Sequence, residues 1–122
     1  MDNKSILETV RGAMGLDTED DSFDFELLLH INNALAVLHQ NAVGVPFTVK
    51  DSLATWEELK DPLQIEGNKM FESVKQYVFL RTKILFDPPP PSTIKYMSEA
   101  ADEILWRLRE SYDLPLSEEV VG

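Results

Sequence analysis

Cysteine is absent from the 122 residues of this chain. Disulfide bonds, thiolate metal ligands and a cysteine nucleophile are therefore excluded. Long apolar runs are absent too: no stretch approaches the roughly 20 apolar residues that cross a bilayer, and the first residues hold no run of signal-peptide length. The sequence predicts no membrane association and no address signal, in a chain sized for one domain with its own core.

Basic residues are scarce, with 11 Lys and Arg against 22 Asp and Glu and a net charge of −11. Nucleic-acid affinity comes largely from Lys and Arg that displace counterions, so direct DNA binding is not expected. The charge is also uneven, because residues 1–66 carry a net −9 and residues 67–122 a net −2. The acidic half of one copy could attract the more basic stretch Lys69–Lys95 of another. Solvated faces that keep a small domain soluble would give the same pattern.

The usual local signatures of catalysis are missing. The chain has no Gly-x-Ser-x-Gly elbow, no Gly-rich phosphate loop and no His-Glu-x-x-His motif. His30 and His39 are nine residues apart on one predicted helix and point in opposite directions, so they cannot share a metal ion. The acidic run from Asp17 has Ser22 and Leu28 where a calcium loop needs Gly and Glu. We therefore expect no catalytic, cofactor-binding or metal-binding residues, and a protein that is not an enzyme.

Apolar periodicity predicts helices over residues 4–14, 24–42, 68–86 and 92–112. Gly15 is placed to end the first helix, and Asp21, Ser22 or Asp24 to cap the second. Asn68 and Ser92 are the expected caps of the third and fourth. Prolines 88–91 lack the amide donor that a helix needs, so they end the third helix near Phe86 and form a rigid corner.

A long connection, residues 44–67, joins the second and third long helices. Val45 to Val49 reads as an extended arm or edge strand, and Thr55-Trp-Glu-Glu as one helical turn. The predicted fold is all-α: a small bundle of about four helices with a long, partly extended connection. We expect one helical domain over 1–113 and a flexible C-terminal tail over 114–122, whose apolar residues could dock on a neighbour or fray.

Several apolar side chains fall outside the predicted core faces. Phe25, Leu29, Ala36 and Val43 form a second stripe along helix 24–42, and Phe79 and Phe86 form one on helix 68–86. Arg81 lies at the centre of an apolar face, where it must find an acid, reach the surface or meet a second chain. Trp106 points to a charged face and is either shielded by neighbours such as Arg109 or a partner anchor. The predicted subunit or partner interface comprises Phe25, Leu29, Phe47, Trp56, Phe79, Arg81, Phe86, Trp106, Leu114, Leu116, Val120 and Val121.

Two segments carry a resemblance to a known family. They are Tyr77-Val-Phe-Leu-Arg-Thr-Lys-Ile-Leu-Phe-Asp-Pro-Pro and, in the next helix, Glu103-Ile-Leu-Trp-Arg-Leu. Both resemble the head–tail connector (adaptor) proteins of tailed bacteriophages, as do the acidic lead into the second helix and the Thr55-Trp56-Glu57 turn. Pro90 and Pro91 depart from the family pattern and leave the start of the last helix open.

The resemblance implies a structural virion protein at the head–tail junction. Such a protein assembles, from the host cytoplasm, into a ring expected to be dodecameric beneath the capsid portal. The ring extends the DNA channel, lets DNA pass without specific binding, and receives the tail or a stopper protein. Two other classes stay open: an acidic helical interaction module such as a DNA mimic, and a small enzyme.

Overall fold

The computed structural model describes residues 4–43, 47–59 and 71–121, with side chains up to residue 110. Its helices are α1 (Ile6–Ala13), α2 (Asp24–Gln40), α3 (Trp56–Leu59), α4 (Phe71–Phe86) and α5 (Pro91–Val121). In these ranges the only β-type pairing is an isolated bridge between Ser5 and Thr55. The all-α prediction is therefore confirmed, and residues 47–49 are extended without forming an edge strand.

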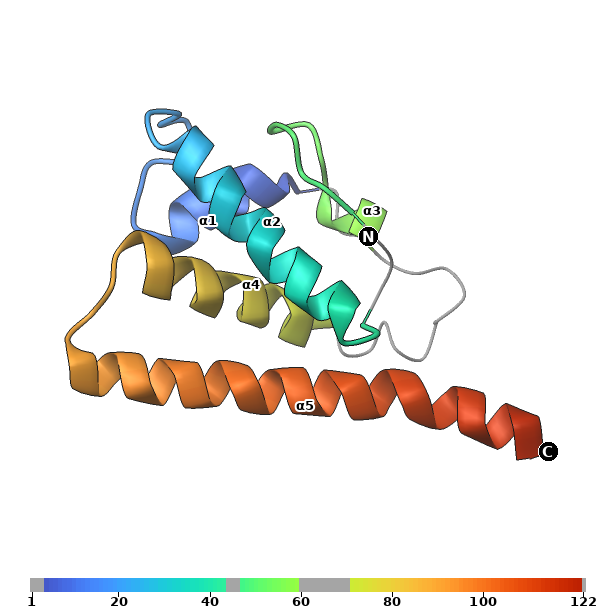
Figure 1. Cartoon of the computed structure of the whole chain (residues 1–122). Coiled ribbons are helices and arrows are strands. Elements are labelled where there is room, and N and C mark those ends of the chain that lie inside the picture. Colours follow the sequence, from blue (N-terminus) through green and yellow to red (C-terminus); the bar gives the residue numbers. More distant parts are fainter. Residues whose placement is uncertain (1–3, 44–46, 60–70, 122) are drawn as a thin grey trace.

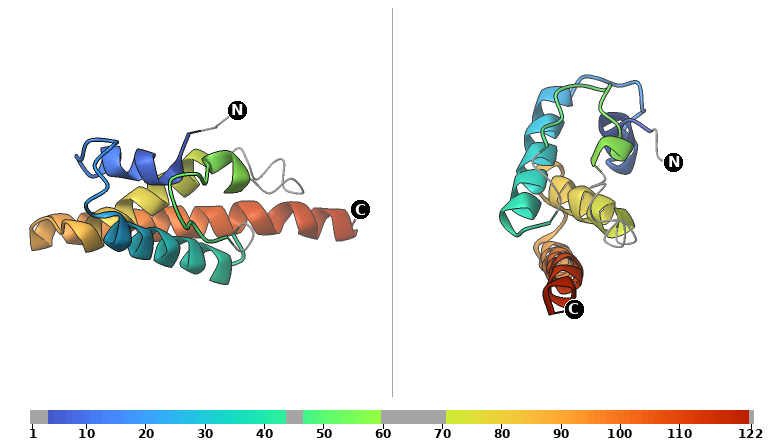
Figure 2. Two further views of the ribbon diagram at one scale, coloured as in Figure 1. Left: turned by 90° about the horizontal axis from the view of Figure 1, so that it is seen from above. Right: turned by 90° about the vertical axis from the view of Figure 1, so that its right-hand side faces the viewer.

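Helix α4 occupies the middle of the molecule and packs against both α2 and α5 (Figure 1). Helix α5 runs antiparallel to α4 along one side and continues past its start. Helices α1 and α3 lie together on one side of the bundle and α2 on the other (Figure 2). The result is a bundle with two distinct flanks, one made by α2 and one made by α1 and α3.

The core is built from the helix faces that the apolar spacing predicts. Ile6, Leu7 and Val10 of α1 are buried, and so are Leu27 and Ile31 of α2. Burying such side chains contributes about 1.5–3 kcal/mol each. The other fully buried large side chains include Trp56, Tyr77, Val78, Thr82 and Leu108.

Hydrogen bonds hold the connection between α2 and α4 to both flanks of the bundle. The Asn32 side-chain amide donates to Val49 O at 2.9 Å, and Val49 N donates to Asn32 Oδ1 at 2.7 Å. On the other flank Ile6 N donates to Ala54 O at 3.0 Å, and Trp56 N donates to Lys4 O at 3.2 Å. These bonds give backbone N–H and C=O groups of the connection partners although the connection forms no strand. They also hold the connection where the Trp56 side chain enters the core.

The helix ends confirm some predicted caps. Helix α4 ends at Phe86, as the prolines predict. At α3 the Glu58 carboxylate accepts from Thr55 N at 2.8 Å, one half of the predicted capping box. Residue Asn68 lies outside the described residues.

Other predicted boundaries were wrong. The N-cap of α2 is Phe23, with no side-chain cap bond, because the Asp24 carboxylate is engaged by Arg11. Helix α5 begins at Pro91, a favoured first helical position, rather than after a Ser92 cap. It also runs to Val121 instead of ending near Tyr112. This extension includes Pro115, which is unfavourable inside a helix, so the composition of the segment does not explain it.

Two glycines, Gly12 inside α1 and Gly15 just after it, predict opposite responses to the same substitution. Gly15 has φ +84°, and the amides of Gly15 and Leu16 donate to Gly12 O and Arg11 O at 3.0 and 2.9 Å, which closes the helix. We expect Gly15→Ala to lower the free energy of unfolding by about 1 kcal/mol. Gly12 is helical, and a Cβ there would meet Thr18 at an ordinary 3.7 Å.

Gly12→Ala is therefore the matched control, and it should raise the free energy of unfolding by up to about 1 kcal/mol. Urea denaturation of both variants measures the two changes. Equal effects of the two substitutions would contradict the assigned end of α1.

Candidate functional site

The outer face of α2 presents apolar side chains to solvent. Its inner face is buried through Leu27, Ile31 and Leu38, and helical geometry turns Phe25 and Leu29 away from that face. The exposed fractions of Phe25 and Leu29 are 80% and 56%. Ala36, two turns further on, is exposed as well. We call Phe25, Leu29 and Ala36 the α2 stripe. Val43, which was predicted to continue this stripe, is buried instead.

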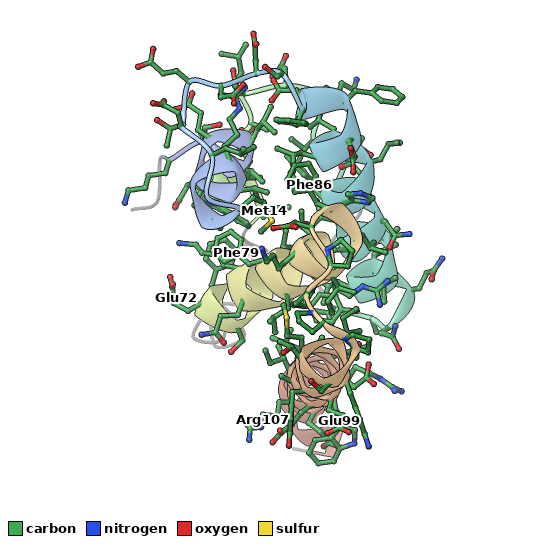
Figure 3. The ribbon with its side chains drawn as sticks, turned by 90° about the vertical axis from the view of Figure 1, so that its left-hand side faces the viewer. Met14, Glu72, Phe79, Phe86, Glu99 and Arg107 are labelled. Carbon is green, nitrogen blue, oxygen red and sulfur yellow. The ribbon has the colours of Figure 1, made fainter. Side chains whose placement is uncertain are left out.

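The second apolar stripe of α4 is covered by the same chain. The Phe79 ring packs edge-to-face on Trp56 with centroids 5.9 Å apart, and Phe86 packs on Phe23 at 5.5 Å. In Figure 3 both labelled side chains lie on the side of α4 toward α1 and α2. Phe79 and Phe86 are therefore only partly exposed.

Trp56 is 0% exposed and packs between Phe79 and Phe71. The prediction that places Trp56 on an interface is wrong, because the connection folds back and inserts this side chain into the core. Phe47, from the same connection, is half-buried against the core. Only part of the Phe47 ring is left to meet another protein.

Arg81 lies where α2, α4 and α5 meet. One of its terminal nitrogens donates to Asn33 Oδ1 at 3.1 Å, and its guanidinium carbon lies 6.0 Å from the centre of the Tyr77 ring. Its Nε is buried without an acceptor among the described residues. A small notch of about 100 Å³ between α4 and α5 borders it, lined also by Leu85 and Asp102. Arg81 therefore forms no ion pair within the described part of the chain.

Helix α5 exposes aromatic rings on a charged surface. Its inner edge is buried through Ala101 and Leu108, whereas Trp106 and Tyr96 are 60% and 74% exposed. Figure 3 shows Glu99 and Arg107 at the edge of the molecule beyond α5, away from α4. The neighbouring side chains do not shield Trp106. Its role as a partner anchor stays a prediction.

The remaining predicted interface residues are Leu114, Leu116, Val120 and Val121. Their backbone belongs to α5. Their side chains lie outside the described set, so their role stays a prediction.

Four large exposed apolar residues escaped the sequence prediction: Phe23, Leu53, Leu85 and Tyr96. Leu53 is 81% exposed in the turn before α3, and Leu85 is 46% exposed in the last turn of α4. Leu53 directly follows Asp51 and Ser52 in a turn, and these polar neighbours were the available signal. Leu85 lies on the predicted core face, but the helix ends one residue later and its neighbours leave it partly uncovered.

Arg11 holds the acidic loop between α1 and α2, residues 17–22, through bonds to Thr18 and Asp24. We call this set of bonds the arginine clasp. Arg11 is 6% exposed, and its Nε and Nη2 donate to the two Asp24 carboxylate oxygens at 3.0 and 2.6 Å. Its Nη1 donates to Thr18 O at 2.6 Å. The bond to Asp24 raises the pKa of Arg11, so the guanidinium stays charged. The clasp went unpredicted, although a lone arginine beside Ile6, Leu7 and Val10 was a usable signal.

The loop held by this clasp carries fixed negative charge. Asp17 and Asp20 accept hydrogen bonds from the amides of Glu19 and Ser22. Hydrogen bonds from the side chain and the amide of Ser22 lower the pKa of Asp20. The loop therefore presents carboxylates at a defined position beside the start of α2.

The described residues contain no cluster of three or more His, Asp or Glu side chains that could hold a metal ion. Within the same part of the chain, none of the helices combines the length and apolarity needed to cross a membrane. What the structure does present is a set of exposed apolar side chains on separate helices, next to fixed charges.

Comparison with known proteins places the chain in a family. The family model described as phage connector protein matches residues 6–114, which run from the start of α1 into α5. Searches of curated proteins and of solved structures gave no match. The matched segment includes every helix except the last residues of α5. The chain therefore belongs to the phage connector protein family, whose members are structural proteins of the virion at the head–tail junction.

Proposed function

We propose that this chain assembles as a ring, expected to be dodecameric, beneath the capsid portal. There it extends the DNA channel and receives the tail or a stopper protein. The observation that carries the proposal is the family match over residues 6–114. Copies made in the host cytoplasm join the portal during assembly and stay in the virion.

Exposed aromatic residues on two separate helices support assembly. A ring of identical chains needs two different contact surfaces on each copy, so that contacts close by rotation. Phe25 on α2 and Trp106 on α5 lie on different helices and are 80% and 60% exposed. Aromatic side chains dominate the energy of protein interfaces. In this proposal the α2 stripe contacts a neighbouring copy, and Trp106 contacts a neighbour or the portal.

The charge of the chain suits a conduit for DNA. A net charge of −11 on each copy repels phosphates, and a ring multiplies that charge. DNA then passes without adhering, because the 22 acidic residues of each copy outnumber its 11 basic residues and disfavour contact with phosphates.

Complementation of defective phage particles tests the proposal. Cells infected with a phage that lacks this protein should accumulate DNA-filled heads and free tails. Adding the purified chain to such an extract should join heads to tails and restore infectivity. Unchanged joining in the absence of the protein would rule out the connector role.

A substitution at Trp106 separates assembly from folding. We expect Trp106→Glu to reduce complementation at least tenfold, since it places a charge in the proposed contact. Because the side chain is 60% exposed, the free energy of unfolding should change by less than about 0.5 kcal/mol. Tyr96→Glu is the control for added charge on the same helix, since Tyr96 lies outside the proposed interface. Full complementation by Trp106→Glu would remove Trp106 from the interface.

A further inference from the structure

We infer that the notch beside Arg81 on one copy pairs with the acidic outer face of α1 on the next copy. In this contact Arg81 meets Glu8 of the next copy, and Asp102 meets its Lys4. The inference rests on the proposed function and adds to it the two surfaces that join neighbouring copies.

The notch between α4 and α5 holds a cation that no acid of the described residues neutralises. Its volume is about 100 Å³, and its lining includes Arg81, Leu85, Ser98 and Asp102. The Arg81 guanidinium donates to the neutral Asn33 Oδ1 at 3.1 Å and lies over the Tyr77 ring. A partly buried guanidinium is stabilised far more by a carboxylate than by an amide oxygen. The notch therefore suits the carboxylate of an incoming side chain.

The notch is a positive spot on an acidic chain. Arg81 lies on its α4 side, and Lys95 is exposed one turn before Ser98 on the same side of α5. Against these two bases stands Asp102, which is exposed and has no ion pair among the described residues. The next acid along α5, Glu99, points away from α4 (Figure 3). A partner surface with an excess of acid would match this spot.

The outer face of α1 has that excess of acid. An open hollow of about 710 Å³ lies there, lined by Lys4 and Glu8, by small and hydroxyl-bearing side chains, and by Leu53. Helical geometry turns Glu8 away from the buried Ile6 and Val10. The charged residues that line this hollow, or are next in sequence to its lining residues and exposed, are Lys4, Glu8, Asp17, Glu19 and Asp51. Lys50, which follows Val49 and precedes Asp51, adds one further base. Four acids against two bases leave this surface negative.

The two surfaces also match in the order of their charges. Lys4 and Glu8 are four residues apart at the start of α1, and both are exposed without an ion pair in the described part of the chain. Arg81 and Asp102 likewise stand on the two walls of one notch. Placing Arg81 against Glu8 brings Asp102 toward Lys4, so both contacts join opposite charges. The reverse placement would join like charges, which selects one register of association.

Each surface adds an exposed leucine beside its charges. Leu85 is 46% exposed at the notch, and Leu53 is 81% exposed at the hollow. A contact that covers both removes apolar surface from water. The notch also adjoins the α2 stripe, because Asn33, which binds Arg81, lies one turn after Leu29 on the same side of α2.

The two surfaces lie on different flanks of the molecule. Figure 2 shows α2 on one side of the bundle and α1 with α3 on the other. The bond between Arg81 and Asn33 places the notch on the α2 side. The notch and the α1 face therefore cannot meet within one chain, whereas one copy can use both at once with two neighbours. That is the head-to-tail arrangement that closes into a ring.

Reversing one charge on each surface tests the contact. Arg81→Glu places an acid opposite Glu8, and Glu8→Arg places a base opposite Arg81. Each variant alone should form about tenfold fewer rings on purified portal, since like charges then face each other. An equal mixture should form rings again, because the two variants can alternate and every contact then joins opposite charges. Electron microscopy counts the rings.

The outcomes of this test are distinct. Rings formed by either reversed variant alone would overturn the inference and leave the proposed function standing. So would a mixture of folded variants that forms no rings while the unmodified chain does. Absence of rings from the unmodified chain would remove the proposed function and this contact together.

A control separates the charge of Arg81 from its bond within the chain. Asn33→Ala removes the acceptor at 3.1 Å but keeps the guanidinium, so it should form rings as the unmodified chain does. Loss of rings in Asn33→Ala would show that Arg81 acts by holding α2, which also overturns the inference.

A second pair of variants repeats the test at exposed residues. Asp102 and Lys4 are both exposed, so Asp102→Lys and Lys4→Glu leave the core intact, and circular dichroism checks that each variant folds. This pair keeps the test decisive if Arg81→Glu does not fold. Each variant alone should form fewer rings than the unmodified chain, and an equal mixture should restore them. Unchanged ring formation by either variant alone would contradict the pairing of Asp102 with Lys4.

Discussion

Replacing Trp56 by alanine is expected to lower the free energy of unfolding by about 4 kcal/mol, a large part of the stability of a small domain. The side chain is 0% exposed, and its ring packs edge-to-face on Phe71 and Phe79 at 6.2 and 5.9 Å. Removing it leaves a cavity between the connection and α4. Urea denaturation followed by circular dichroism measures the change.

Trp106→Ala is the matched control, since this second tryptophan is 60% exposed. Its substitution should change the free energy of unfolding by less than about 0.5 kcal/mol. The fluorescence of the two variants adds a check, because the chain has two tryptophans and each variant reports on the other. A Trp56→Ala protein as stable as Trp106→Ala would show that the connection does not pack on α4.

Breaking the arginine clasp should have the second largest effect. We expect Arg11→Met to lower the free energy of unfolding by about 3 kcal/mol, because it leaves the Asp24 carboxylate partly buried without its cation. It also removes the donor to Thr18 O at 2.6 Å. In a double-mutant cycle with Asp24→Asn, the coupling energy should exceed about 1 kcal/mol.

An exposed ion pair on α5 provides the control for the clasp. Arg107 pairs with Glu103, and both side chains are about 60% exposed. Arg107→Met should therefore cost less than about 0.5 kcal/mol. If Arg11→Met and Arg107→Met lowered the free energy of unfolding equally, burial would not strengthen the ion pair between Arg11 and Asp24.

The sequence predicted helical faces well where the partner surface lies nearby. The α2 stripe was predicted because the period of 3.6 residues separates Phe25 and Leu29 from the buried Leu27 and Ile31. The abrupt end of α4 followed from the prolines. Both conclusions rest on local geometry, which a single sequence contains.

The sequence failed where a distant segment supplies the partner. Phe79 and Phe86 looked unpartnered because their neighbours, Trp56 and Phe23, come from segments many residues away. Arg11 was overlooked for a similar reason, since its acceptor lies beyond the acidic loop. Periodicity assigns a residue to a face but does not say what covers that face. This limit explains why Trp56 was predicted at an interface although it lies in the core.

Electron microscopy of the purified chain mixed with the portal tests the central claim most directly. The account predicts a closed ring of density attached to one end of the portal, with an open channel that continues the portal channel. Sedimentation of the same mixture should show the chain moving with the portal. A chain that stays monomeric and sediments apart from the portal would contradict the account.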